Sequence, residues 1–235
     1  MFPGLSELPV HQQINAGSAA MNREMFQRNG VIAISIFGGP GCGKTSLLEV
    51  TLRHLRNRLR IGVIVGNVRA DEDVERLRHW SSPVIGIEAI DLDAALVREA
   101  LLRIDLSPLD LLLIERAAAA PPEPQDLGQA ATVGMFSVSG GHDKVDRYPE
   151  RVCGTNLVLL TKADLLPFVP FDATAFRASV NRLNQQAQVL EISAVNGFGL
   201  GEWFGWITSQ LREPPEAALA NKGFPSSRTT DYFVG

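Results

Sequence analysis

The stretch from Phe37 to Ser46, FGGPGCGKTS, determines how the rest of the chain is interpreted. Its residues 38–45 match the pattern G-x-x-x-x-G-K-[ST] at every fixed position. Directly before it lies VIAISIF, residues 31–37, an apolar run typical of a strand buried on both faces. An amphipathic helical pattern follows over residues 45–60. A glycine-rich turn between such elements predicts a phosphate-binding loop, because its backbone N–H groups and the helix N-terminus both favour anions.

The motif also assigns roles to individual residues. We expect Lys44 to reach the β- and γ-phosphates of a nucleotide and the Thr45 hydroxyl to hold Mg²⁺. Cys42 is expected to be a small filler whose thiol the helix N-terminus acidifies, which would make it sensitive to oxidation. The residues expected to contact the nucleotide phosphates are Gly38, Gly39, Pro40, Gly41, Cys42, Gly43, Lys44, Thr45 and Ser46.

Outside the loop, apolar runs bounded by turn residues alternate with helical patterns. This alternation predicts an α/β fold of the P-loop NTPase class, with three α/β/α layers and a mostly parallel central sheet. Further strands are expected over 61–65, 83–87, 109–115, 132–138, 156–160 and 188–193, and further helices over 14–28, 71–81, 93–104, 171–185 and 199–212. The first helix should turn Ile14, Met21 and Met25 to one face, and the last should bury Leu200, Trp203, Phe204, Ile207 and Leu211.

Length and composition limit the organisation of the chain. Its 235 residues suit one sizeable core, which we place in residues 1–212 with a helix at about 12–28 packed on it. Residues 213–235 lack a periodic pattern and are expected to form a tail that is mobile or that docks late. A net charge of -4 argues against nucleic acid, and no apolar run reaches the roughly 20 residues that span a membrane. Two cysteines and no signal-peptide pattern favour a reduced, cytoplasmic setting.

Two later segments indicate which base the nucleotide carries. TKAD, residues 161–164, follows a predicted strand, so the Asp164 carboxylate could accept hydrogen bonds from the N1 and N2 donors of guanine. The Lys162 stem would lie along the base ring. After the next strand, Ser193 and Ala194 place backbone N–H groups where the guanine O6 could accept them. We therefore predict GTP and GDP as ligands.

Seven stretches together resemble HypB-type hydrogenase-maturation proteins of the HypB/UreG family of P-loop GTPases. They are residues 15–55, 66–78, 91–96, 110–115, 140–150, 159–168 and 192–203, in one register over about 14–212. The resemblance implies a cytoplasmic GTPase that helps to deliver nickel to a metalloenzyme client. It also implies a homodimer that forms across the nucleotide and binds metal at its interface, with Ni²⁺ or Zn²⁺ beside GTP or GDP and Mg²⁺.

The sequence departs from this family at its metal-binding positions. A family Cys-His pair is replaced by Ile90 and Asp91, and a further family cysteine falls within Pro121–Pro124. Nickel and zinc prefer nitrogen and sulfur ligands, so no transition-metal site of the usual kind is predicted. Cys153, His142 and Asp143 have no metal-site spacing and are not expected to form a replacement.

A second set of departures concerns hydrolysis. The family Gly-Asp after the second strand is Gly66-Asn67, and the family Glu-Asn-Val-Gly is Glu115-Arg116-Ala117-Ala118. Glu115 is retained and is expected in the Mg²⁺ shell. Asn67 cannot act as a base, so we predict slow turnover. Asp71 is a candidate for Mg²⁺ or water positioning, with helix capping by Asp71 and Asp73 as the alternative. The catalytic set is thus Lys44, Asp71 and Glu115, and the Mg²⁺ set is Thr45, Asp71 and Glu115.

Three functional hypotheses follow. The first is a slow GTPase whose nucleotide state gates nickel transfer to a hydrogenase-type enzyme. The second is a nucleotide-dependent switch that binds a partner or dimerises but has lost metal handling. The third is a chaperone for a harder metal ion, with Asp91 or Asp93 as ligands.

Overall fold

The computed structural model of the chain describes residues 10–67, 70–81, 83–89, 91–117 and 125–211. Its centre is a seven-stranded sheet in the order β3-β2-β4-β1-β5-β6-β7, and every pair of neighbouring strands is parallel. All seven predicted strands are confirmed to within a few residues. They are β1 (Ile32–Gly38), β2 (Ile61–Asn67), β3 (Val84–Glu88), β4 (Leu111–Ala117), β5 (Ala131–Ser137), β6 (Leu157–Thr161) and β7 (Gln188–Ile192).

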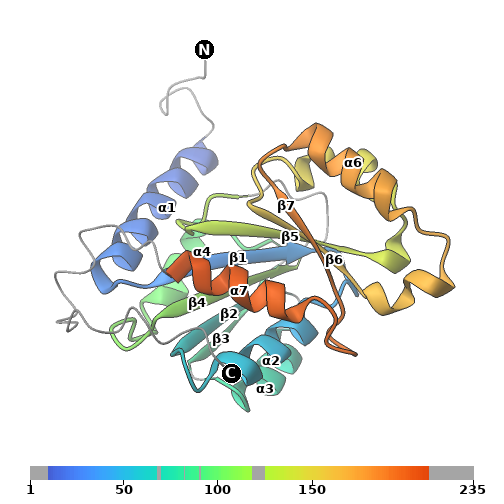
Figure 1. Cartoon of the computed structure of the whole chain (residues 1–235). Coiled ribbons are helices and arrows are strands. Elements are labelled where there is room, and N and C mark those ends of the chain that lie inside the picture. The colour runs from blue at the N-terminus through green and yellow to red at the C-terminus, as the bar shows by residue number, and fades with distance from the viewer. Residues whose placement is uncertain (1–9, 68–69, 82, 90, 118–124, 212–235) are drawn as a thin grey trace.

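Helices cover both faces of this sheet and give the predicted three layers (Figure 1). Side chains along a strand point alternately to opposite faces. In β4, Leu111 and Leu113 therefore join the core on one face of the sheet, whereas Leu112 and Ile114 join the core on the opposite face. This two-sided burial explains why the central strands are continuous apolar runs rather than alternating ones.

The six predicted helices are present, mostly with shorter ends than expected. They are α1 (Val10–Asn29), α2 (Lys44–Leu55), α3 (Ala70–Arg78), α4 (Ala94–Leu101), α6 (Ala173–Leu183) and α7 (Leu200–Leu211). In α7, Trp203 and Ile207 are buried as predicted, and Trp203 Nε1 donates to Thr51 Oγ1 of α2 at 2.8 Å. Leu200, Phe204 and Leu211, which were also predicted to be buried, are only half-buried. Among the described residues, no helix has both the length and the apolar character needed to cross a membrane.

The face of α1 that meets the protein is not the predicted one. Ile14 and Met21 are 57% and 51% exposed, whereas Ala19, Asn22 and Phe26 are buried. Asn22 Nδ2 donates to the backbone oxygens of Ala94 (2.9 Å) and Leu127 (3.1 Å), so a polar side chain anchors the helix. Hydrophobic spacing alone cannot reveal this, because the contact depends on hydrogen bonds to distant carbonyls.

Short helical turns between β5 and β6, and after β6, were not predicted from sequence. They are η2 (Val138–Gly140), α5 (Lys144–Arg147), η3 (Pro149–Arg151) and η4 (Ala163–Phe168). Val145, Val152 and Phe176 lie in a third core cluster beneath this region. Segments of three to six residues carry too little periodicity to be recognised in a sequence. The predicted tail, residues 213–235, lies outside the described residues.

Candidate nucleotide site

The predicted phosphate loop connects the end of β1 at Gly38 to the start of α2 at Lys44. Gly41 and Gly43 have φ angles of +70° and +92°, which favour glycine. Gly38 is required for a different reason. A Cβ there would lie 2.7 Å from Cys42 Sγ and 2.9 Å from the Met135 carbonyl oxygen. The glycines therefore allow a tight loop whose end presents the first amides of α2.

The side chain of Lys44 extends back to the start of the phosphate loop. Its Nζ donates to the carbonyl oxygens of Gly38 (3.0 Å) and Gly39 (3.4 Å), and the residue is buried. An ammonium group has three N–H donors, so these contacts orient the charge and leave donor capacity for phosphate.

Glu115 lies directly behind the loop, because β4 pairs with β1 and sets Glu115 opposite Ile36. The Thr45 hydroxyl is 3.4 and 3.5 Å from the two Glu115 carboxylate oxygens. The pKa of Glu115 is raised to about 7, chiefly by burial and to a smaller extent by the charge of Asp73, whereas Lys44 and Thr45 oppose the rise. A carboxylate and a hydroxyl are hard oxygen donors of the kind that Mg²⁺ binds, and a bound cation would favour the ionised form. The residues present therefore fit a magnesium ion.

The acidic residues of α3 are arranged differently from the prediction. The helix begins at Ala70, so Asp71 and Asp73 both lie in its first turn rather than before it. Acidic side chains there interact favourably with the helix dipole. Asp71 is exposed, and Asp73 is the α3 carboxylate whose charge acts on the pKa of Glu115. The charge of Asp73 therefore reaches Glu115, whereas Asp71 lies exposed on the first turn of α3.

The residues predicted to recognise the base come together at the ends of β6 and β7. Lys162 follows β6 in a left-handed conformation, with a φ of 60°. The buried Ser193 follows β7, and its hydroxyl donates to Asp164 Oδ1 at 2.6 Å. Ser193 Oγ in turn accepts from the Val195 N–H at 3.2 Å. This chain of hydrogen bonds fixes one carboxylate oxygen and leaves the other available to accept from a base.

Thr161, a residue that the sequence analysis did not single out, links the two halves of the site. Its hydroxyl lies 2.7 Å from the Cys42 carbonyl oxygen and 3.1 Å from that of Phe136. The first of these contacts crosses from the end of β6 to the phosphate loop. The distance between the phosphate-binding and base-binding segments is therefore set partly by one buried side chain.

The position where the family carries metal ligands holds an ion pair here. Arg116 is 1% exposed, and its Nη2 donates to Asp91 Oδ1 at 2.8 Å. Its Nε donates to the Leu92 carbonyl at 3.2 Å, and Gln125 Nε2 donates to Asp91 Oδ2 at 2.8 Å. Asp93 caps α4 by accepting from the Leu96 N–H. Both carboxylates that a harder metal was predicted to use are thus already hydrogen-bonded.

Cys153, His142 and Asp143 are the residues that were considered, and not expected, as a replacement for the family's metal site. In the portion of the chain that the structure describes, no three His, Cys, Asp or Glu side chains are grouped so as to hold a metal ion. His142 packs edge-on against Phe171, and Asp143 pairs with Arg147. Ile90, Ala118 and residues 121–124 lie outside the described residues, as does the side chain of Asn67.

The prediction that the helix N-terminus acidifies the Cys42 thiol is wrong. Burial raises the pKa of the Cys42 thiol, and the nearby charge of Lys44 only partly opposes this effect. Desolvation of the thiolate thus outweighs the helix N-terminus. The side chain is buried, in agreement with its predicted role as a filler.

We accordingly expect Cys153, which is exposed, to react with iodoacetamide at pH 8 at least about tenfold faster than Cys42. Mass spectrometry of timed samples of the native protein gives both rates. In urea, where burial is lost, the two cysteines should react at similar rates. Equal reactivity in the native protein would show that the Cys42 thiolate is accessible and stabilised.

Taken together, a glycine-rich phosphate loop, a buried carboxylate beside it and an aspartate at the ends of β6 and β7 form the arrangement expected of a P-loop GTPase. The family model described as "CobW/HypB/UreG, nucleotide-binding domain" matches residues 32–191. The chain belongs to this family.

Its similar relatives include hydrogenase maturation factors. The factor HypB of Azotobacter vinelandii is 38% identical over 218 residues, which cover 88% of this chain and 72% of the relative. HypB of Escherichia coli strain K12 is 32% identical, and the match covers 88% of this chain and 75% of the relative. Among solved structures, HypB from Archaeoglobus fulgidus gives a TM-score of 0.78 at 32% identity, covering 84% of this chain and 98% of that one. HypB from Helicobacter pylori in complex with nickel gives a TM-score of 0.79 at 25% sequence identity. The match covers 85% of this chain and 95% of that one.

Proposed function

We propose that this chain is a slow GTP hydrolase that acts as a maturation factor and delivers nickel to a hydrogenase-type enzyme. The observation that carries the proposal is the joint placement of Lys44, Thr45, Glu115 and the Asp164–Ser193 pair at one edge of the sheet. Similarity to hydrogenase maturation factors along 88% of the chain supports the client class. The relative solved with nickel supports the metal.

Within this proposal, Lys44 binds the β- and γ-phosphates, and Thr45 and Glu115 hold Mg²⁺. Asp71 positions Mg²⁺ or its water from the first turn of α3. Mg²⁺ supplies charge stabilisation at the transferring phosphoryl group. We assign the α3 role to Asp71, and Asp73, whose charge acts on Glu115, is the alternative. A larger loss of hydrolysis for Asp73→Asn than for Asp71→Asn would move this role to Asp73.

Two further parts of the proposal concern assembly and location. We propose that two copies of the chain associate in the GTP-bound state and that the protein works in the cytoplasm. Gel filtration with GTP–Mg²⁺ and with GDP–Mg²⁺ tests the first part directly. A single elution volume in both states would contradict nucleotide-dependent association.

The slow turnover is attributed to Asn67, the last residue of β2. Because β2 pairs with β4, the end of β2 lies next to the end of the strand that carries Glu115. We expect Asn67→Asp to raise the single-turnover rate of GTP hydrolysis by about tenfold or more, because it supplies a carboxylate base. Asn67→Ala is the control and should give no gain. An unchanged rate in the aspartate variant would show that another step limits hydrolysis.

Nickel delivery is tested by titrating the protein with Ni²⁺ and Zn²⁺ in the presence of GTP–Mg²⁺ or GDP–Mg²⁺. Nickel delivery requires tight, stoichiometric nickel binding that differs between the two nucleotide states. Asp91→Asn is the matched control and should bind nickel equally well, because Asp91 is engaged by Arg116 and Gln125. Failure to bind metal in either state would contradict nickel delivery and leave a GTP-dependent partner switch.

A further inference from the structure

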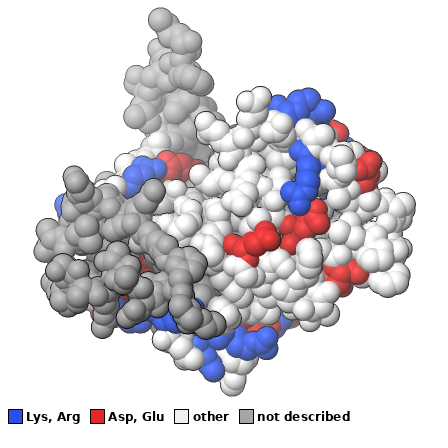
Figure 2. All heavy atoms as spheres, viewed as in Figure 1, with Lys and Arg blue, Asp and Glu red and all other residues white. Residues whose placement is uncertain are grey.

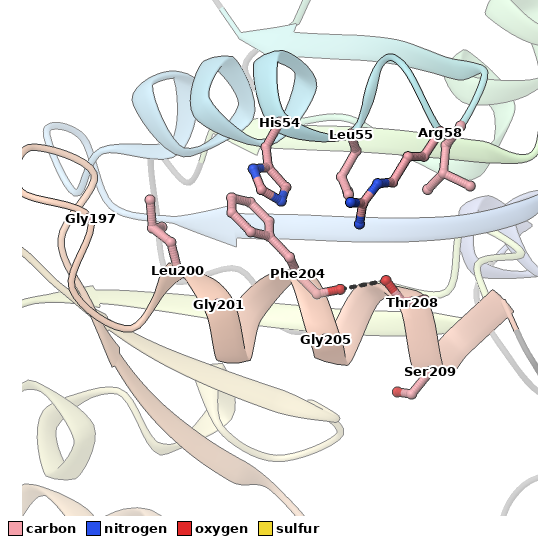
Figure 3. A pocket seen from close by; sticks show the side chains of 11 residues that line it. His54, Leu55, Arg58, Gly197, Leu200, Gly201, Phe204, Gly205, Thr208 and Ser209 are labelled. Carbon is pink, nitrogen blue, oxygen red and sulfur yellow. Dashed lines mark hydrogen bonds between the residues drawn. The ribbon is translucent and has the colours of Figure 1, made fainter. Parts of the chain in front are cut away.

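A groove of about 550 Å³ runs between the C-terminal half of α2 and the length of α7 (Figure 3). It lies outside the nucleotide site. From α2 and the turn after it, the lining residues are His54, Leu55 and Arg58, and from α7 they include Leu200 and Phe204. The His54 and Phe204 rings are stacked, with centroids 4.1 Å apart and planes 6° apart. One ring comes from each helix, so the two helices contact each other through this stack, and both side chains contribute apolar surface to the groove.

Glycines keep this groove open. Gly197, Gly201 and Gly205 are spaced four residues apart and all line it. A Cβ at any of the three would meet no atom within 4 Å. Glycine in a helix interior costs stability relative to alanine, by roughly 1 kcal/mol at each position. Gly201 and Gly205 both lie within α7, so this helix gives up stability at two positions that line the same groove.

The surface around the groove suits an apolar occupant with a negative charge. Glu202 is the one charged residue of α7. Figure 2 shows acidic and basic side chains only at scattered points on the face that carries α7, with uncharged surface between them. Among the described residues, Arg58 lines the groove with a positive charge, and no acidic residue lines it.

A segment with that chemistry is attached at the end of the groove. Thr208 and Ser209, which line it, belong to the last turn of α7, and the chain continues from Arg212 onward. The 12-residue helix is about 18 Å long, a distance that about six extended residues can cover. Residues 231–234 read Asp-Tyr-Phe-Val, an acidic residue followed by two aromatic ones.

We propose that the C-terminal segment of this chain folds back into the α2–α7 groove. In this arrangement Tyr232 and Phe233 pack against His54 and Phe204, and Asp231 lies beside Arg58. Covalent attachment gives the segment a local concentration on the order of millimolar, which favours it over a second copy of the chain or an unrelated protein.

The test measures how fast trypsin cleaves after Arg228 in the full-length protein. Release of residues 229–235 is followed by mass spectrometry under native conditions. We expect Gly205→Leu, which places a side chain in the groove, to accelerate this cleavage at least about tenfold. Tyr232→Ala combined with Phe233→Ala should accelerate it equally, through the other partner of the contact.

Gly17→Leu is the matched control, because Gly17 is also an exposed helical glycine with open space around its Cβ. It should leave the cleavage rate unchanged, and thermal melts should show that all variants are folded. Equal cleavage in the wild type and both groove variants would overturn the proposal. Protection that grows with protein concentration would also overturn it, because the occupant would then be the segment of a second copy.

Discussion

Asp164→Asn is expected to weaken GDP binding about 100-fold and to move the base preference toward xanthine. The Asp164 carboxylate accepts the Ser193 hydroxyl through Oδ1, which holds the second oxygen ready for the base. Hydrogen bonds to a charged group contribute about 1.5–3 kcal/mol each. An amide keeps one acceptor but turns an N–H toward the guanine amino group. Losing about 3 kcal/mol corresponds to roughly 100-fold in affinity.

Xanthine carries a carbonyl where guanine carries that amino group, so the asparagine N–H then finds an acceptor. Competition of XDP and GDP for a fluorescent guanine nucleotide measures both affinities. Ser193→Ala is the control. It removes the orienting contact but keeps the carboxylate, so it should weaken GDP binding only about tenfold, without any gain for XDP. Undiminished GDP affinity in Asp164→Asn would mean that another residue recognises the base.

Asp91→Ala is expected to lower the free energy of unfolding by about 2–3 kcal/mol. Its partner Arg116 is 1% exposed, so the variant leaves a guanidinium buried without a counter-charge. Breaking a buried pair in this way costs about 3–5 kcal/mol. We reduce this figure because Asp91 itself is 47% exposed, and solvent weakens the interaction.

Urea unfolding at pH 7 measures the effect, and a double-mutant cycle isolates it. Arg116→Met removes the buried charge and fills much of its volume, so Asp91→Ala in that background should cost less than about 0.5 kcal/mol. If Asp91→Ala is as destabilising in the Arg116→Met background as in the wild type, the ion pair is not the cause.

The sequence was sufficient for features set by local patterns. Strand positions followed from apolar runs, because most strands are buried on both faces. The phosphate loop followed from glycine and lysine spacing. Asp164 and Ser193 lie 29 positions apart and make the direct contact expected of a shared base pocket, because parallel strands end at the same edge of the sheet.

Features that depend on distant partners could not be predicted. The contact of Asn22 with two remote carbonyls decided which face of α1 is buried. Arg116 was noticed only as a departure from the family, and its pairing with Asp91 needed coordinates. His54 had no assigned role, because its stacking on Phe204 joins residues 150 positions apart in the numbering. Cys42 was misjudged because burial, which outweighs the helix dipole there, is a property of the packed protein.

The pairing of Arg116 with Asp91 also restricts the routes by which this sequence can evolve. Replacing Asp91 alone leaves the buried Arg116 without its counter-charge. Replacing Arg116 alone removes the donor that the Leu92 carbonyl accepts from. Each single step toward a different pair of side chains therefore passes through a less stable protein. The two positions are therefore expected to change together, because a protein that replaces both residues avoids the less stable single variants.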